Sequence, residues 1–505
     1  MYPRTLKSTA ILAAFVVSGL PTPHASASRP DGVLTVETVD QSTSEPIAAR
    51  MTLRNARGRI VRMAHPAALP SGVVAFDGTI DLPLKKGNYT FLIDAGPEFA
   101  TQTGRFTIER RSEDTKQVQL ERKADMNAAG WWAADLDAQL RGAEAPVWLR
   151  ASGLSLMPLL AAQSIGNDCE QLKAPPAAID GLQLYGPWAS LRLEKGSGLL
   201  VAGGESHVDP CQPTAALFTA AAEQDARVLT LSADAWELPL WLAAGRVQAI
   251  GVFHRGLNTP LPKDQRGRPP TPRKFPGKQG PGRWNEAIYH HALNCGLRLP
   301  PFAASGAGCE TKKLSGLRPG DARTYTYCDD DFSRAAWWDA FSAGRVVATN
   351  GPLLRTSVEG EPPGHVFRLE AGERRSFQIG LSLSFYREWP VEYLEIVRDG
   401  RVEHEVRLAD LAANRGRLPP LEFDRSGWFL VRAVTNDTSR YRYATTGPYY
   451  VEAGYQQRIS RRSVEFFRQW VDELADRYQD EPAAAARVAE ARGFWDRMLE
   501  RANAE

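Results

Sequence analysis

The stretch RVLTLSADAWELPLWLAAGRVQAIGVF, residues 227–253, decides the fold class. Its first six residues are an apolar run that predicts a short buried strand. The next run, DAWELPLWLAAG, predicts a helix that ends at Gly245, because glycine commonly terminates a helix. RVQAIGVF then resumes as a strand. A strand, a helix and a strand in succession favour parallel pairing with the helix outside, hence an α/β barrel or a layered sheet.

The same order of elements recurs further along the chain. SRAAWWDAFSAG predicts a helix that ends at Gly344, and RVVATNG, which follows it, predicts another strand. We therefore assign residues 124–352 to one α/β unit.

The region before this unit, residues 31–123, shows a different pattern. Short runs such as ARMTLRN and NYTFLID alternate in polarity and are separated by turn signals at Gly58, Gly78 and Gly87. Helical periodicity is absent. This region is predicted to be a small β-sandwich with an accessory role.

Two further regions follow the α/β unit. Residues 353–455 predict a second β-sandwich, since the Asp399-Gly400 turn between YLEIVR and RVEHEV is a strong hairpin signal. Residues 456–505 predict a helical hairpin that packs on the body of the protein. Its apolar side chains keep a spacing of three and four, at Val464, Phe467, Val471, Leu474 and Tyr478, and again at Val488, Ala491, Trp495 and Leu499.

The first segment is typical of a secretory signal. Arg4 and Lys7 precede the apolar run AILAAFVVSGL, and small residues then lead to Ala27. Residues 1–27 are therefore predicted to be a signal peptide. The apolar run is too short for a transmembrane helix, and no later stretch reaches about 18 uninterrupted apolar residues. We expect a secreted or periplasmic protein without a transmembrane segment.

Composition excludes several classes of function. The 505 residues are 43% hydrophobic and 24% charged, with a net charge of +2. This balance gives no electrostatic reason to bind nucleic acid or an anionic membrane. The chain also lacks a GxSxG elbow, a Walker-type phosphate loop and an HExxH motif. The sequence does not predict an oligomeric state.

Export makes disulfides permissible for the five cysteines. Their spacing does not indicate a structural zinc site. Cys169 with Cys211 and Cys309 with Cys328 are plausible bridges, which would leave Cys295 as a buried thiol. Other pairings of four of these five residues remain open.

The stretch GWWAADLDAQL, residues 130–140, contains the first candidate site. If its second half continues a strand, Asp135, Asp137 and Gln139 lie on one face. Such a run at the start of a domain is a natural first ligand strand for a metal. Histidines are expected at the last two of these positions. Asp137, a carboxylate, and Gln139, a weakly ligating amide, stand there instead.

Several segments together resemble one family of enzymes. They are GWWAADLDAQL, LPLWLAAGRVQAIGV, WNEAIYHHALNCGLRLPP and AWWDAFSAGRVVATNGPLL. With the flanking regions, they resemble the secreted CehA/McbA-like metallohydrolases of the PHP superfamily (polymerase and histidinol phosphatase type). The resemblance implies a distorted (β/α)₇ barrel that binds divalent metals at the carboxyl ends of its strands. It also implies hydrolysis by a metal-activated water.

Only some ligand positions of that family are kept here. Its opening His-x-His falls on Asp137 and Gln139, although Asp135 matches. Its Asp-His pair falls on alanines at 161 and 162, and its last Asp-x-His has become AASGAG at 303–308. Its Gly-x-Glu is matched by Glu205, with His207 and Asp209 close by, and its later histidines are matched by His254 and His291.

Two functions of different classes follow from this comparison. The first is a protein that keeps the fold, has lost efficient hydrolysis and binds a small molecule, a polymer or a partner at the old active-site mouth. It would hold no metal or one divalent ion. The second is a divergent hydrolase of esters, carbamates or phosphoesters, in which one zinc, manganese or iron ion is held by Asp137, Glu205, His207 and His254.

In the second function, Asp135 or His207 would serve as the general base. A structural protein of the cell envelope is a third possibility, and it predicts no ligand.

Overall fold

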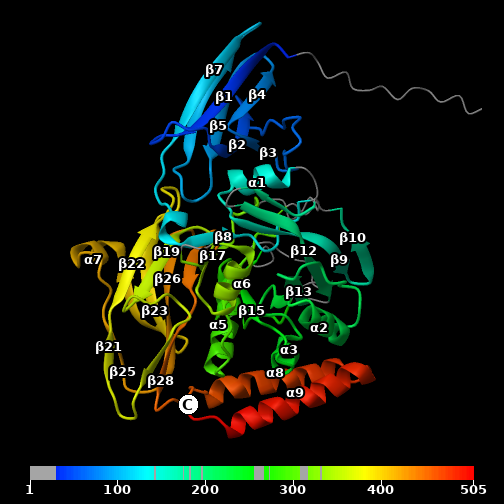
Figure 1. Ribbon diagram of the computed structural model, residues 1–505, viewed down its shortest axis with the longest axis vertical. Coiled ribbons are helices and arrows are strands. Elements are labelled where there is room, and N and C mark those ends of the chain that lie inside the picture. The colour runs from blue at the N-terminus through cyan, green and yellow to red at the C-terminus, as the bar shows by residue number, and fades with distance from the viewer. Residues whose placement is uncertain are drawn as a thin grey trace, which may run out of the picture.

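The computed structural model describes residues 30–140, 144–173, 176–180, 183–194, 197–254, 267–271, 273–307, 317–329 and 332–505. Figure 1 shows a β module at the top, an α/β body below it, a second β region beside the body and two helices along the bottom. The chain is thus multidomain and rich in strands, as predicted. The predicted signal peptide, 1–27, lies outside the described residues.

The N-terminal module consists of two sheets that enclose one apolar core. One sheet has the order β4 (Thr79–Leu84), β1 (Gly32–Asp40) and β7 (Glu113–Leu120). The other has the order β3 (Val73–Asp77), β2 (Ala48–Asn55), β5 (Gly87–Asp94) and β6 (Gln102–Ile108). Alternate side chains point into the core, as strand β4 shows most regularly. The predicted sandwich character of this region is confirmed.

The α/β body begins after a short 3₁₀ helix, η1 (Asn127–Ala129). Its strands are β8 (Trp131–Ala134), β9 (Leu156–Ile165), β10 (Asp168–Gln171), β11 (Ala178–Asp180), β12 (Gln183–Glu194), β13 (Ser197–Ala202), β14 (Arg227–Thr230), β15 (Ala249–Phe253), β16 (Pro301–Ala303), β17 (Arg323–Tyr327) and β18 (Val346–Thr349). Its helices are α1 (Ala145–Ala151), α2 (Thr214–Glu223), α3 (Leu238–Ala243), α5 (Gly280–Asn294) and α6 (Arg334–Ser342).

Most strands of this body point the same way. Strands β8, β9 and β12 pair in parallel, and so do β14, β15 and β16. Strand β13 runs antiparallel to both β12 and β14, and β17 runs antiparallel to both β8 and β18. Seven strands (β8, β9, β12, β14, β15, β16 and β18) therefore have their carboxyl ends at one end of the sheet.

The element order predicted from residues 227–253 is confirmed. Strands β14 and β15 pair in parallel, and α3 lies between them in sequence. Gly245 follows the helix with a φ of 63°, a left-handed conformation that favours glycine. The helix is shorter than predicted, because Pro239 lies in its first turn and the residues before it form turns.

The sheet closes into a barrel at β16 and β17. The Thr324 hydroxyl joins the two strands, since it accepts a hydrogen bond from the Ala303 amide at 3.0 Å and donates one to the Ala303 carbonyl at 3.1 Å. A side chain thus makes the hydrogen bonds that a strand backbone would otherwise make.

The third region continues the same sheet. Its elements are β19 (Leu353–Val358), β20 (Val366–Leu369), β21 (Arg375–Phe377), β22 (Ile379–Ser384), β23 (Val391–Arg398), β24 (Arg401–Arg407), α7 (Leu408–Ala413), β25 (Leu421–Phe423), β26 (Gly427–Thr435), β27 (Tyr443–Thr446) and β28 (Tyr449–Ala453). Strand β18 of the body pairs antiparallel with β27, so hydrogen bonding crosses the boundary predicted after residue 352. The hairpin predicted at Asp399-Gly400 is present between β23 and β24.

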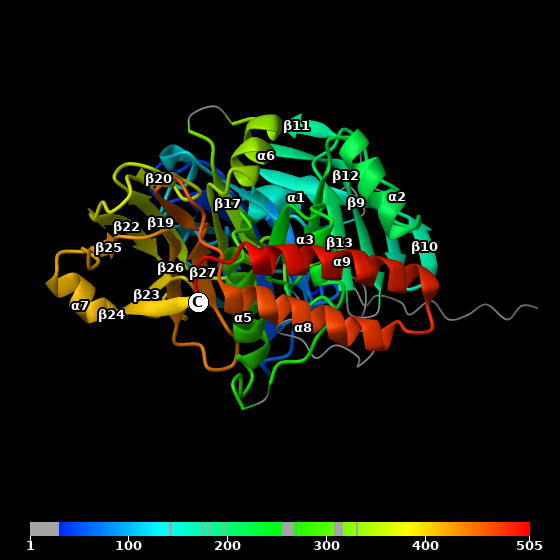
Figure 2. The same ribbon diagram turned by 90° about the horizontal axis from the view of Figure 1, so that it is seen from below.

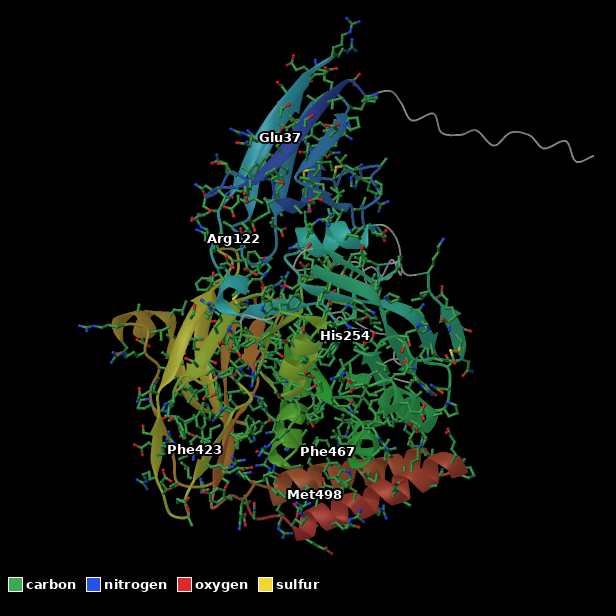
Figure 3. The ribbon with its side chains drawn as sticks, viewed as in Figure 1. Glu37, Arg122, His254, Phe423, Phe467 and Met498 are labelled. Carbon is green, nitrogen blue, oxygen red and sulfur yellow. A yellow bond between two sulfur atoms is a disulfide. The ribbon has the colours of Figure 1, made fainter. Side chains whose placement is uncertain are left out.

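The C-terminal hairpin consists of α8 (Arg461–Arg477) and α9 (Pro482–Glu500), which lie side by side beneath the body (Figure 2). The apolar stripe predicted for α8 is buried, and so are Val488, Ala491 and Trp495 of α9. Phe467 and Met498, labelled in Figure 3, belong to the same apolar cluster as residues of α3 and α5. The predicted helical hairpin is therefore confirmed.

The cysteines agree with the prediction in part. Cys169 and Cys211 form a disulfide, and Cys295 is a buried free thiol. Cys328 is also a free buried thiol, and its predicted partner, Cys309, lies outside the described residues. Among the helices of the described ranges, none is long and apolar enough to cross a membrane.

Candidate functional site

The candidate site lies where the parallel strands end. Asp135 and Asp137 follow β8, His254 follows β15 and Ser305 follows β16. Because these strands point the same way, their carboxyl ends bring residues distant in sequence to one end of the barrel. Figure 3 labels His254 within the α/β body.

Asp137, His254 and Gln139 form a buried cluster at this end. Asp137 Oδ2 lies 2.9 Å from His254 Nε2, and Asp137 Oδ1 accepts a hydrogen bond from the Gln139 amide at 3.0 Å. The Gln139 backbone N–H donates to the Ala307 carbonyl at 2.7 Å. At most 7% of the surface of each of these three residues is exposed. Both carboxylate oxygens of Asp137 thus contact side chains of the protein.

Asp135 is completely buried and accepts four hydrogen bonds. Its Oδ1 accepts from the backbone N–H groups of Asp137, at 3.3 Å, and Ser305, at 3.0 Å. Its Oδ2 accepts from the Ser305 hydroxyl and from the Gly320 N–H at 2.8 Å. Burial raises the pKa of Asp135 to about 6, against the opposing effect of these donors. Asp135 therefore holds three loops together, a positioning role.

Glu205 and His207 lie at the opposite end of the barrel. They follow β13, the strand that runs antiparallel to its neighbours, so its carboxyl end lies beside Arg227 at the start of β14. Glu205 is 91% exposed and pairs with Arg334, at the start of α6. The structure therefore does not bring Glu205 and His207 together with Asp137 and His254.

Asp209 and His291 also lie away from the barrel mouth. Asp209 accepts a hydrogen bond from the Cys211 N–H at 3.0 Å, within the loop that carries the disulfide. His291 lies on α5, 2.9 Å from the Ser463 hydroxyl and stacked on Phe466 of α8. Burial lowers the pKa of His291 to about 4. Its contacts make it part of the seam between α5 and the helical hairpin.

The donors at the mouth do not fit a two-metal centre. Such a centre needs roughly six to eight nitrogen and oxygen ligands. Within the parts of the chain that the structure describes, no three His, Cys, Asp or Glu side chains lie close enough to hold a metal ion. Asp137 and His254, with the weak amide ligand Gln139, are the donors that the described residues bring together.

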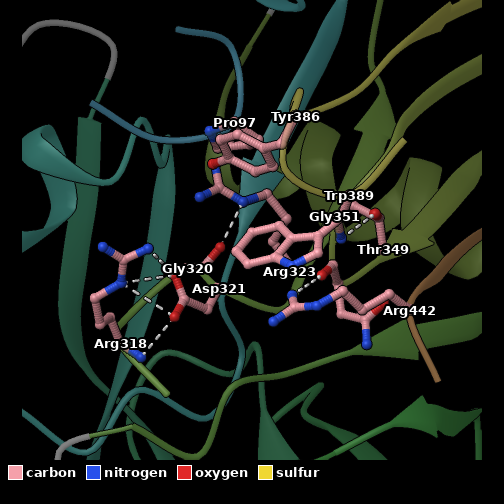
Figure 4. A pocket seen from close by; sticks show the side chains of 11 residues that line it. Pro97, Arg318, Gly320, Asp321, Arg323, Thr349, Gly351, Tyr386, Trp389 and Arg442 are labelled. Atoms are coloured by element: carbon pink, nitrogen blue, oxygen red, sulfur yellow. Dashed lines mark hydrogen bonds and ion pairs between the residues drawn. The ribbon is translucent and has the colours of Figure 1, made fainter. Parts of the chain in front are cut away.

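Sequence reasoning missed a pocket beside this site. It has a volume of about 40 Å³ and lies where the N-terminal module, the body and the third region meet. Figure 4 shows the indole of Trp389 between the Arg318–Asp321 pair and Arg442. Its lining includes Gly320, whose N–H binds Asp135. The residues come from five segments that are distant in sequence, and no local motif marks them.

A buried cluster of charges supports this pocket. Asp94 of β5 pairs with Arg50 of β2 and, at 2.7 Å, with Arg318. Asp321 lies 3.2 Å from Arg50 and 3.1 Å from Arg318. Burial alone would raise the pKa of Asp94, but the two guanidinium groups outweigh it and lower the pKa to about 2. These pairs join the N-terminal module to the body.

Comparisons with known proteins leave the family open. No protein-family model matches the sequence, and no curated protein matches it. Among solved structures, the Bacillus anthracis TIE protein aligns at 20% identity over 21% of this chain and 18% of its own, with a TM-score of 0.14.

Two other structures are similarly distant. The fibronectin(III)-like modules of Clostridium thermocellum CbhA align at 12% identity over 27% of this chain and 65% of their own, with a TM-score of 0.15. The N-terminal four Ig domains of Dscam1 isoform 8.4 align at 9% identity over 84% of this chain and 72% of their own, also with a TM-score of 0.15. These scores are too low to carry an argument about fold or function.

Proposed function

We propose that this protein is an exported, degenerate relative of the PHP-type metallohydrolases. It binds a small molecule, a polymer or a partner at the barrel mouth and lacks efficient hydrolysis. One observation carries the proposal: the Asp137 carboxylate contacts His254 through one oxygen and Gln139 through the other. A carboxylate held in this way is less available to a metal than one that faces an open site.

The direction of the strands supports the family assignment. Seven strands of the body share one direction, and six of them form parallel pairs, with a helix following several of them in sequence; this order is compatible with the barrel that the sequence resemblance implies. Asp137 and Gln139, which stand where the family has its His-x-His, come at the carboxyl end of the first barrel strand. Ligand sites of parallel barrels lie at that end.

The separation of the candidate ligands favours binding over hydrolysis. The hydrolase alternative places one ion on four residues, of which Glu205 and His207 belong to the other end of the barrel. Losing a ligand weakens metal affinity strongly, since even residues that only orient ligands are worth about 10–100-fold.

Metal analysis and an activity screen test the proposal. We expect protein purified without chelators to contain far less than one zinc, manganese or iron per chain. We also expect no metal-dependent turnover of ester, carbamate or phosphoester substrates. Stoichiometric metal, with turnover that Asp137→Ala abolishes and that Glu205→Ala at the other end spares, would refute it.

Restoring the lost motif tests the family assignment separately. The double substitution Asp137→His and Gln139→His recreates a His-x-His beside His254. If the barrel is of the PHP type, this variant gains at least about 100-fold in zinc affinity, because three imidazoles form a good zinc site. A matched pair of histidines at the exposed positions Glu113 and Thr115 of β7 gains no comparable affinity. Equal affinities in the two variants would contradict the assignment.

The Cys169–Cys211 disulfide supports export, because such bridges persist in oxidising compartments. Mass spectrometry of the exported protein should find an N-terminus at Ser28 if cleavage follows Ala27. An intact N-terminus in the cytoplasmic fraction would contradict this part of the proposal.

A further inference from the structure

One face of the N-terminal module contains an open hollow of about 530 Å³, on the sheet formed by β2, β5 and β6. The β3 side of the same sheet packs on the body, where Val73 and Ala75 share an apolar cluster with Trp148 of α1. Figure 1 shows the module at the end of the molecule far from the helical hairpin. The residues that line the hollow are Thr52, Arg54, Thr90, Phe91, Leu92, Thr103, Gly104 and Arg105.

The register of the three strands arranges the outward side chains of this hollow in two rows. Arg54, Thr90 and Arg105 form one row across the strands, and Thr52, Leu92 and Thr103 form the next. Neighbouring strands lie about 4.8 Å apart, so the backbones of the two arginines are separated by about 10 Å. The first row therefore offers two cationic groups with a neutral hydroxyl between them.

Both arginines have hydrogen-bond donors to spare. Their side chains are exposed. Arg54 donates through Nη1 to the Gly58 carbonyl at 3.0 Å, and its other nitrogens have no partner among the described residues. The guanidinium of Arg105 contacts no acceptor within the part of the chain that the structure describes. Each group can therefore bind an oxygen of a ligand at little cost to the protein's own contacts.

The charges of this face favour an anion. None of the residues that line the hollow is acidic, so two positive charges stand there without a negative one. Two carboxylates lie further along the same face, and both are already paired: Asp94 with Arg50, and Asp77 with Arg150. An anion over the hollow meets no unpaired carboxylate among these residues.

We propose that this face binds an anionic polysaccharide in which acidic and neutral sugars alternate. The polymer crosses the strands, so that two uronate carboxylates pair with Arg54 and Arg105 while a neutral sugar lies over Thr90. Leu92, in the second row, offers an apolar surface to the C–H groups of the sugars. The site shares no residue with the barrel mouth, so it stands whether or not the proposed function holds.

The spacing of the arginines argues against a more densely charged polymer. A nucleic-acid strand has one charge about every 3.4 Å, so phosphates between the two arginines would find no cationic partner. Bases also need an aromatic surface on which to stack, and the aromatic residue of the lining, Phe91, is buried. A polymer with fewer charges and many hydroxyls matches this face better.

Calorimetry on the full chain tests the proposal. The probe is a hyaluronan octasaccharide, in which glucuronate and N-acetylglucosamine alternate, and its control is the same oligosaccharide with the carboxylates reduced to alcohols. We expect the acidic form to bind at least tenfold more tightly and to lose affinity as salt is raised, because salt screens exposed charges. Equal affinity of the two forms, or no binding at about 1 mM, would overturn the proposal. Equally tight binding of an oligothymidylate would also overturn it, since that result identifies a general polyanion surface.

Two double variants locate the binding. Arg54→Gln with Arg105→Gln removes both cationic groups and should weaken binding at least tenfold, while the exposure of both positions keeps the fold intact. The control, Lys86→Gln with Lys116→Gln, removes two exposed charges elsewhere on the module, in the turn before β5 and on β7. Its affinity should stay within twofold of the wild type. Equal losses in the two double variants, or no loss in the first, would refute the assignment.

Discussion

Asp135 shows how a single buried carboxylate can organise a barrel mouth. Its oxygens accept hydrogen bonds from one residue after β8, from one residue after β16 and from Gly320 in the turn before β17. At neutral pH the group is ionised, since its pKa is raised only to about 6. The four donors then face a full negative charge and bind it strongly. Asp135 thereby sets the position of the loops next to Asp137.

Replacing this carboxylate should destabilise the protein. Asp135→Ala leaves the Ser305 and Gly320 donors buried without acceptors, which costs about 3 kcal/mol or more. Urea denaturation at pH 7 measures the change. Asp339→Asn is the control, because Asp339 is 76% exposed and its substitution should cost less than about 0.5 kcal/mol. Equal stability of Asp135→Ala and the wild type would show that these hydrogen bonds are not needed.

The two histidines of α5 should make the fold sensitive to mild acid. Burial lowers the pKa of His290 and of His291 from 6.5 to about 4. Between these values the unfolded chain holds a proton that the folded chain does not. Stability therefore falls as the pH drops from 6.5 towards 4, by about 3 kcal/mol for each histidine.

Melting temperatures of the wild type and of His290→Phe/His291→Gln, measured from pH 7 to pH 5, check this expectation. Asp135 acts in the opposite sense, since a folded pKa of about 6 makes the fold gain stability as the pH drops below 6. The comparison removes that effect because both proteins contain Asp135. The double variant should lose less stability than the wild type on acidification. If the melting temperatures of the two proteins fell equally between pH 7 and pH 5, the two histidines would not be the source of the acid sensitivity.

At the scale of elements, strand β17 offers a matched pair of threonines. Thr324 and Thr326 are both completely buried. Thr324 exchanges two hydrogen bonds with Ala303 of β16, whereas the Thr326 hydroxyl has no partner among the described residues. Thr324→Val should therefore cost about 1–3 kcal/mol, while Thr326→Val should be neutral or stabilising. Equal effects in urea denaturation would show that the hydroxyl does not close the barrel.

The elements also show what the sequence could predict. The run at residues 227–253 predicted β14, α3 and β15, because local apolar patterns report a strand or a helix directly. Asp137 and His254 were expected together, and they meet because both follow parallel strands. Glu205 was misplaced by the same reasoning, since β13 is a reversed strand within a mostly parallel order. No local pattern gives the direction of a strand.

Other parts of the site are beyond prediction from one sequence. Ser305 is one serine in the run AASGAG, and nothing in that run indicates that its hydroxyl binds Asp135. Pro97 and Arg442 line the same pocket although 345 residues separate them. Contacts of this kind depend on how whole regions pack, which apolar periodicity does not report.

At the scale of the whole molecule, one buried ion pair should hold the N-terminal module in place. Asp94→Asn leaves Arg50 buried with a weaker set of partners, which costs about 3–5 kcal/mol. We expect the module to loosen and trypsin to cleave after Arg122 or Lys123, in the connection to the body. Gel electrophoresis of timed digests measures the rate.

A second ion pair across the same boundary provides the control. Arg150 of α1 pairs with Asp77 of β3 at 2.8 Å, but Asp77 is 56% exposed. Exposed pairs contribute about 0–1 kcal/mol, so Asp77→Asn should leave the digestion rate nearly unchanged. Comparable rates for both variants would argue against a special role for the buried pair.

The pairing of β18 with β27 bears on how the regions of this protein fold. Separating the two regions at residue 352 would break the hydrogen bonds between β18 and β27. Each of these strands would then have an unpaired edge, and unpaired edges favour aggregation. The barrel and its C-terminal companion should therefore fold as one unit, whereas the N-terminal module is joined to the body mainly through side chains.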